Sequence, residues 1–328
     1  MAEIIDTRTD PEAALSRAEE VLSEGRPVAI PTETVYGLAA DATNPDAISH
    51  IYEMKGRPRF NPLICHVSDV AMAEEHVAFD PLSRRLAEAF WPGPLTLILP
   101  LKTTSKVHPL ASAGLDTLGV RMPDGFSRKV IARFGRPLAA PSANTSGKIS
   151  PTTAAHVEAD LGEKLLLILD DGPSQIGLES TILKVEGDAI RLLRPGGLDV
   201  ADVERLTGTT VERPSTAGAT IEAPGMLASH YAPGASVRLN ATSVVGGEAL
   251  IRFGGMTING EENAAVVLDL SPSGNLREAA AHLFDYMKRA DASGAATIAF
   301  GPIPKEGLGE AILDRIERAA APRDGGLV

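Results

Sequence analysis

The chain has 328 residues, of which 44% are apolar and 23% are charged, and it carries a formal net charge of −12. This composition is typical of a globular protein with a packed core, and the length fits two domains. The negative charge argues against a general nucleic-acid-binding surface, but it leaves room for a local basic pocket. Because Cys65 is the only cysteine, an intrachain disulfide and a cysteine metal cluster are both excluded.

The first residues, MAEIIDTRTD, contain acids where a signal peptide has a basic segment and an apolar core. No apolar run approaches the length of a membrane span. We therefore expect a cytoplasmic protein without a membrane partner, and a single cysteine agrees with a reducing compartment.

The first half of the chain alternates helix and strand signals. Four pairs of Asp, Asn or Ser followed by Pro predict helices, because the first residue caps a helix and proline fits its first turn. These helices begin at Pro11, Pro45, Pro81 and Pro151, the last one capped by Ser150. Short apolar runs predict buried strands at 27–31, 62–67, 95–100, 118–123, 137–141, 164–170, 180–185 and 189–194. This order predicts an α/β fold with a mixed sheet in a first domain, residues 1–207.

The pattern changes after about Leu206. Residues 208–234 are rich in Gly, Pro, Thr and Ala without an apolar period, which predicts a linker. Strand signals and two amphipathic helical segments follow, and they predict a small α/β domain over 235–328.

The stretch APSANTSGKIS, 140–150, imitates a phosphate-binding loop. A Walker loop needs glycine where this chain has Ser142, and a hydroxyl residue where it has Ile149, so that motif is excluded. Its hydroxyl and amide side chains suit a turn and a helix cap. The N–H groups of the helix predicted at Pro151 also suit an anion, and the two interpretations are compatible.

Cations gather near the end of the helix predicted at Pro45. Lys55 suits the negative end of the helix dipole, whereas Arg57 and Arg59 lie beyond the helix and point to phosphate. Arg121 and Arg194 end apolar runs, where arginine reaches solvent or binds a carboxylate or phosphate.

Other polar residues of the first domain have a structural interpretation beside the functional one. The stretch PTETVYG, with Thr32 and Thr34, fits a turn at the end of a strand. His66 and Cys65 fit a buried strand better than catalysis, and Asp170 and Asp171 fit a turn better than a magnesium site. Hydroxyls, Lys, Arg, Asn and one His suit the transfer of a phosphoryl or nucleotidyl group, where positioning and charge supply most of the catalysis.

Together and in this order, the motifs resemble the YrdC-like family in its long two-domain form, the L-threonylcarbamoyladenylate synthases. The first domain carries PTETVYGLAADA, KGRPRFNPLICHV, WPGPLTLIL, TLGVRMPDG, APSANTSGKISPT, GLESTILKV and LLRPGG, and the linker carries SHYAP, 229–233. The resemblance implies a twisted mixed sheet with a concave cavity and a small Rossmann-like C-terminal α/β domain.

The resemblance also implies a reaction. L-Threonine, bicarbonate and ATP, with Mg²⁺, give threonylcarbamoyl-AMP and pyrophosphate. Separate proteins then transfer the product to tRNA as the eventual acceptor, in the threonylcarbamoyladenosine modification.

Site residues follow from the resemblance, position by position. It implies threonine contacts at Thr34, His66, Arg121, Ala140 and Ser180. It implies ATP contacts at Arg57, Asn61, Thr117, Ser142, Ser150, Arg194 and Tyr231, and a catalytic role for Lys55. No protein metal ligand is implied.

The residue types agree with this chemistry. Arg121 can clamp the amino-acid carboxylate. We expect a pocket poor in carboxylates, which does not hold the attacking amine as an ammonium. No covalent protein intermediate is needed.

Two rivals stay open: an enzyme of the same fold that acts on another carbamoyl compound, and an RNA-binding module built on Lys55–Arg59. The SHYAP linker disfavours the first, and the net charge of −12 disfavours the second.

Overall fold

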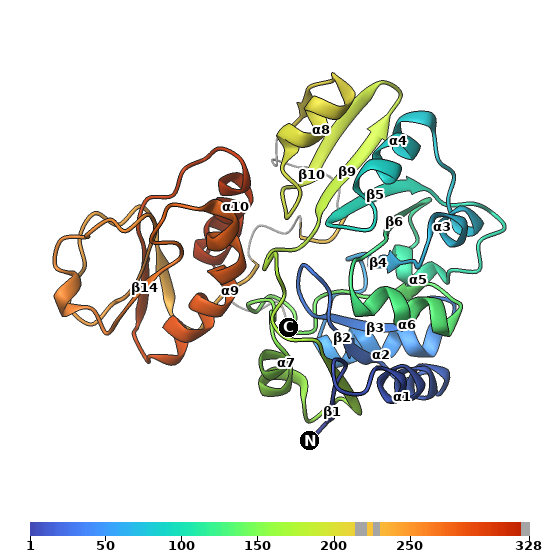
Figure 1. Cartoon of the computed structure of the whole chain (residues 1–328), viewed down its shortest axis with the longest axis horizontal. Coiled ribbons are helices and arrows are strands. Elements are labelled where there is room, and N and C mark those ends of the chain that lie inside the picture. The colour runs from blue at the N-terminus through green and yellow to red at the C-terminus, as the bar shows by residue number, and fades with distance from the viewer. Residues whose placement is uncertain (214–221, 226–229, 323–328) are drawn as a thin grey trace.

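The computed structural model describes residues 1–213, 222–225 and 230–322. Its elements form two α/β bodies, one on each side of the linker, and the helices of the smaller body lie on the side that faces the larger one (Figure 1). Within the described residues, no helix combines the length and the apolar character that are needed to cross a lipid bilayer.

The larger body is built on an 11-stranded mixed sheet among the described residues, in the order β1-β8-β2-β3-β7-β4-β6-β5-β9-β10-β11. Its strands are β1 (Glu3–Asp6), β2 (Val28–Ile30), β3 (Gly37–Asp41), β4 (Ile64–His66), β5 (Leu95–Pro100), β6 (Thr117–Arg121), β7 (Leu138–Ala139), β8 (Leu167–Asp170), β9 (Thr181–Glu186), β10 (Ala189–Arg194) and β11 (Val211–Glu212). The expected mixed sheet is confirmed, because parallel pairs such as β4 with β6 alternate with antiparallel pairs such as β5 with β6.

The helices of this body are α1 (Pro11–Ser23), α2 (Pro45–Lys55), α3 (Val70–His76), α4 (Pro81–Phe90), α5 (Pro109–Ser112), α6 (Phe126–Phe134), α7 (Ala154–Leu161) and α8 (Val200–Thr207). Three of the four predicted starts are confirmed, since the side chains of Asp10, Asn44 and Asp80 each accept from backbone N–H groups of the first turn.

The fourth predicted helix start is wrong. Helix α7 begins at Ala154 rather than at Pro151, and Thr153 caps it by accepting from the N–H of His156. Ser150 therefore does not cap this helix. Its hydroxyl donates instead to Glu179, with 2.5 Å between Ser150 Oγ and Glu179 Oε1. Ser150 lies before the start of the helix, so no backbone N–H of the first turn is capped by its oxygen.

The smaller body contains a parallel four-stranded sheet among the described residues, in the order β12-β15-β13-β14. Its elements are β12 (Ser236–Arg238), β13 (Ala249–Arg252), η1 (Glu261–Asn263), β14 (Val266–Asp269), α9 (Leu276–Ala292), β15 (Thr297–Phe300) and α10 (Leu308–Ala320). The expected small α/β domain is confirmed, and its Rossmann-like character stays a prediction.

One apolar cluster joins the two bodies. Val35, Ile149 and Leu178 of the larger body belong to the same buried cluster as Tyr231 of the linker and Phe284 of α9. The larger body has its own core between sheet and helices, which includes the buried Cys65 that the sequence predicts as a small core residue. The small body is therefore packed onto the large one through a shared apolar contact.

Candidate active site

A cavity opens between the large sheet, the loop after α2, the stretch 140–147 and the linker, and together with the open solvent at its mouth it encloses about 690 Å³. It is lined by Thr32, Val35, Gly37, Lys55, Arg57, Pro62, Leu63, Ile64, His66, Arg121, Ala140, Pro141, Ser142, Asn144, Ser146, Gly147, Glu179, Ser180, Arg194, Pro224, Gly225, His230 and Tyr231. Segments far apart in the sequence thus contribute to a single site.

Most of the residues singled out in the sequence line this cavity. They are Lys55, Arg57, His66, Arg121, Ala140, Ser142, Ser180, Arg194 and Tyr231. The first residue of the SHYAP motif, Ser229, lies outside the described residues. The next two residues, His230 and Tyr231, reach the cavity from the linker.

Four predicted site residues, Thr34, Asn61, Thr117 and Ser150, are not among the lining residues. Thr34 is fully buried, and its hydroxyl lies 2.8 Å from that of Thr32, which does line the cavity. Asn61 is buried with its Oδ1 atom unpartnered. Thr117 begins β6 beside Pro100. Ser150 lies one hydrogen bond behind Glu179.

The loop after α2 carries two of the cavity's cations. Gly56 ends the helix in the left-handed region, with φ of 58°, where glycine avoids the strain of a side chain. Lys55 Nζ then donates to the backbone carbonyls of Ser142, at 2.6 Å, and of Asn144. Burial lowers the pKa of Lys55 well below its usual value, and the charge of Arg57 lowers it further.

Arg57 and Arg194 are buried guanidinium groups held mainly by backbone carbonyls. Arg57 donates to the carbonyls of Asn61 and Pro62, at 3.2 and 2.8 Å. Arg194 donates to the carbonyl of Ser180, with 2.9 Å from Nη2 to O. Burial lowers the pKa of both groups, that of Arg57 to about 10. Within the part of the chain that the structure describes, neither guanidinium is within ion-pair distance of a carboxylate.

Strand register brings Arg121 and His66 together. They are direct partners in the parallel pair β4–β6. Burial and the charge of Arg121 lower the pKa of His66 to about 3, so its imidazole is neutral at neutral pH. Its Nδ1 atom is buried and has no hydrogen-bond partner. A neutral imidazole beside an arginine can accept or donate a hydrogen bond to a ligand.

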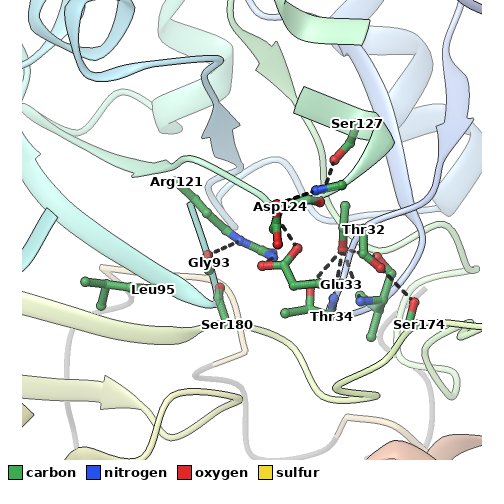
Figure 2. A network of polar contacts seen from close by, with 12 residues as sticks. Thr32, Glu33, Thr34, Gly93, Leu95, Arg121, Asp124, Ser127, Ser174 and Ser180 are labelled. Atoms are coloured by element: carbon green, nitrogen blue, oxygen red, sulfur yellow. Dashed lines mark hydrogen bonds and ion pairs between the residues drawn. The ribbon is translucent and has the colours of Figure 1, made fainter. Parts of the chain in front are cut away.

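Glu33 holds the guanidinium of Arg121 in place. Figure 2 shows the Glu33 carboxylate between Arg121 and Asp124. Glu33 Oε1 lies 2.6 Å from Arg121 Nη2, and Glu33 Oε2 accepts from the backbone N–H of Asp124 at 3.2 Å. Arg121 Nε also donates to the carbonyl of Gly93 at 3.2 Å. Arg121 is therefore buried and oriented, and it does not reach out to solvent.

The expectation of a pocket poor in carboxylates is confirmed, because Glu179 is the one carboxylate residue among the described residues that line the cavity. Glu33 contacts Arg121. Each carboxylate is paired with an arginine, which offsets its charge. Both residues lie inside the motifs PTETVYG and GLEST, so position in a motif was the signal that could have revealed them.

The charges of the cavity favour anionic ligands. Lys55, Arg57, Arg121 and Arg194 all line it. Among the described residues, no group of three or more His, Cys, Asp or Glu side chains is placed to hold a metal ion. The fold and the site thus define an α/β protein with a cation-lined cavity that suits anionic ligands.

Two family models divide the chain. The Sua5/YciO/YrdC model, described as "Telomere recombination", matches residues 20–196. The model described as "Threonylcarbamoyl-AMP synthase, C-terminal domain" matches residues 198–321. The chain therefore belongs to the Sua5/YciO/YrdC family, in the two-domain form, and the resemblance noted in the sequence is confirmed.

Relatives match along nearly the whole chain. A protein of Bacillus subtilis named threonylcarbamoyl-AMP synthase is 39% identical over 98% of this chain and 97% of its own length. A protein of the same name from Pyrococcus abyssi is 39% identical, with 92% of each chain covered. The crystal structure of P. abyssi Sua5 complexed with L-threonine has a TM-score of 0.83 and 36% identity, and it covers 93% of this chain and 94% of its own.

Proposed function

We propose that this chain is a threonylcarbamoyl-AMP synthase, which converts L-threonine, bicarbonate and ATP to threonylcarbamoyl-AMP, pyrophosphate and water. The observation that carries the proposal is the cavity, which gathers Arg57, Arg121 and Arg194 around one space. Full-length similarity to relatives of that name supports it.

For the threonine end of the cavity, we propose the part around β4 and β6. Arg121 binds the carboxylate with the N–H groups that Glu33 and Gly93 leave free. His66 and Ser180 meet the polar groups of the amino acid, with the backbone at Ala140 beside them. Thr34 does not line the cavity, and it acts on the amino acid through the hydrogen bond between its hydroxyl and that of Thr32.

For the nucleotide end, we propose the cations near the linker. Arg57 and Arg194 contact the phosphates together with the hydroxyl of Ser142, and Tyr231 closes this end from the linker. Lys55 holds the loop that carries Ser142 by donating to the carbonyl of that residue. It also adds to the positive electrostatic potential at the phosphates. Asn61 and Ser150 are buried outside the lining of the cavity, and Thr117 begins β6. These three residues support this end or reach it after a local rearrangement.

The chemistry then needs positioning and charge more than a protein nucleophile. The neutral threonine amine attacks the bicarbonate carbon, and a carbamate forms with loss of water. A carbamate oxygen attacks the α-phosphorus of ATP, the bond to the β-phosphate oxygen breaks, and pyrophosphate leaves. Because Glu179, which lines the cavity, and Glu33, which contacts Arg121, are both paired with arginines, they exert little pull on the amine as an ammonium.

The wider setting is proposed on the same grounds. The described residues do not fit a resident metal, so we expect Mg²⁺ to enter with ATP and derive no step through it. Residues 1–207 form the catalytic domain, 208–234 the linker and 235–328 the small domain. The product passes to transfer proteins that modify tRNA, in the cytoplasm.

Pyrophosphate release tests the proposal against both rivals. We expect the purified chain to release pyrophosphate from ATP when threonine and bicarbonate are present, and to stop when either is omitted. Release that is indifferent to threonine contradicts the proposal and favours another carbamoyl substrate. Salt-sensitive RNA binding without turnover supports the RNA-binding alternative instead.

A further inference from the structure

Glu179 is a buried carboxylate shared between the cavity and the small domain. It lines the cavity and is 8% exposed. Its Oε1 atom accepts from the hydroxyl of Ser150 at 2.5 Å, and its Oε2 atom accepts from Arg315 Nε at 2.8 Å. Each oxygen thus has a strong donor, one from each side of the domain boundary.

Arg315 comes from the small domain and reaches the wall of the cavity. It lies on α10 and is fully buried, with a relative exposure of 0%. Besides Glu179, its guanidinium donates to the carbonyl of Pro195 at 2.9 Å and to Asp314 at 2.5 Å. Its guanidinium carbon lies 5.0 Å from the centre of the Tyr231 ring. A fully buried arginine with this many partners holds a fixed position.

The charge of Glu179 bears directly on the neighbouring cation. Burial alone raises the pKa of Glu179, but the charges of Arg315 and Arg194 outweigh burial and bring that pKa down to about 2. The carboxylate of Glu179 therefore stays ionised beside a cavity whose arginines favour anionic ligands. Of the two arginines whose charges lower the pKa of Glu179, Arg194 is the one that remains when Arg315 is removed. Arg194 also lines the cavity.

We propose that Arg315 is a positioning residue for the nucleotide end of the cavity, which neutralises Glu179 so that Arg194 stays available to the phosphates of the substrate. The proposal rests on the proposed function for the identity of the nucleotide. It makes the small domain a functional part of the site, although Arg315 is not itself a lining residue.

A charge-cycle experiment separates this role from simple domain docking. We expect Arg315→Met to raise the KM for ATP by about tenfold while the KM for threonine stays within about twofold. Adding Glu179→Gln in the same chain removes the unpaired carboxylate, and most of the ATP affinity returns. Arg315→Lys keeps the charge and loses the fork, so it gives an intermediate KM.

Arg289→Met is the matched control. It removes the same charge from the small domain at a position where the side chain is 56% exposed, and we expect both KM values to stay unchanged. If Arg315→Met fails to fold, the double variant still tests the proposal, because a buried neutral pair avoids the uncompensated charge.

The outcomes are distinct. If the KM values for ATP and threonine rise together and Glu179→Gln restores neither, then Arg315 acts only in docking and the proposal is overturned. Wild-type protein without threonine-dependent pyrophosphate release contradicts the proposed function instead. The affinity of each variant for a non-hydrolysable ATP analogue, measured by calorimetry, then decides the role of Arg315. We expect Arg315→Met to weaken this affinity by about tenfold and the added Glu179→Gln to restore most of it.

Discussion

At the scale of single residues, Arg121 is engaged before any substrate binds. Its side chain is 5% exposed, and that of its partner Glu33 is 11% exposed. A guanidinium has five N–H donors, and Glu33 and Gly93 accept from two of them. Donors therefore remain for a substrate carboxylate, in an orientation that the protein has already fixed.

Replacing Arg121 tests its role in threonine binding. We expect Arg121→Ala to cost about 2 kcal/mol or more of threonine affinity, because it removes the clamp and leaves Glu33 buried without its partner. Arg121→Lys keeps the charge but loses the planar fork, so it recovers only part of the affinity. Calorimetric titration with threonine measures both effects.

The control is Arg128→Ala. Arg128 also donates to a backbone carbonyl, that of Ser68 at 2.7 Å, but it does not line the cavity. The Arg128→Ala protein should bind threonine with the same affinity as the wild type. Unchanged threonine binding in Arg121→Ala would show that the carboxylate is bound elsewhere.

Two histidines, the buried His66 and the half-buried His230, make stability sensitive to mild acid. Burial lowers the pKa of both His66 and His230 to about 3, against 6.5 for an unperturbed histidine. Between these values the unfolded chain binds a proton that the folded chain does not. Stability is therefore complete above about pH 6.5 and falls as the pH drops toward 3, by up to about 1.4 kcal/mol per pH unit for each histidine.

Urea unfolding at pH 7.0, 6.0 and 5.0 measures this slope. We expect His66→Asn to make stability fall less steeply with decreasing pH, by up to the contribution of one histidine. Equal slopes in wild type and His66→Asn contradict the inferred titration of His66.

Sequence reasoning reached the cations of the site better than their anionic partners. Arg57 was recognisable because it follows a helix end, where the helix dipole does not account for a charge. Glu33 and Glu179 gave no comparable signal, because a single acid in a strand-end motif is equally common at the surface. Their pairing with Arg121 and Arg315 depends on contacts between residues 88 and 136 positions apart.

At the scale of elements, helix caps follow local rules where the helix begins at the predicted residue. Asp10, Asn44 and Asp80 cap α1, α2 and α4 as predicted. Ser150 differs because the helix begins only at Ala154, where Thr153 is the cap. The hydroxyl of Ser150 donates to Glu179, which lies 29 positions away, and the sequence holds no local sign of that contact.

The cap of α7 can be tested directly. We expect Thr153→Ala to lower the free energy of unfolding by about 1 kcal/mol, because the N–H of His156 loses its acceptor. Thr153→Ser keeps an oxygen in the same place and should retain most of the stability. Urea denaturation provides the measurement, and a Thr153→Ala protein as stable as the wild type would contradict the assignment of the cap.

Several short elements escaped sequence analysis for a physical reason. Strand β11 has only two residues, Val211–Glu212, and α5 has only four, Pro109–Ser112. Such segments are fixed by their neighbours rather than by a periodic pattern of their own. The longer strands β5 and β10 coincide with their predicted runs because each is a six-residue segment rich in buried apolar side chains.

At the scale of the whole molecule, the two bodies share both apolar and ionic contacts. The cluster around Tyr231 and Phe284 includes residues of both bodies. The ion pair of Glu179 with Arg315 also crosses the boundary, and so does the contact of 3.3 Å between His156 Nε2 and Asp285 Oδ1. Contacts of this kind couple the unfolding of one body to that of the other.

We therefore expect a single unfolding transition. Trp91, the only tryptophan, lies in the larger body and reports on it alone by fluorescence. Circular dichroism reports on both bodies, and the two curves should coincide in urea. Arg315→Met should separate them, with the small body unfolding first. Separate transitions in the wild type would contradict this coupling.

The way Arg57 and Arg194 are held has a consequence for any solution in which the protein is handled. A carbonyl dipole orients a guanidinium without cancelling its charge, so the empty cavity carries a positive charge that mobile anions from the solvent must balance. A nucleotide that enters the cavity must therefore displace chloride or phosphate ions from it. Nucleotide affinity should fall as the salt concentration rises, and titrations in phosphate or sulfate buffers will understate it.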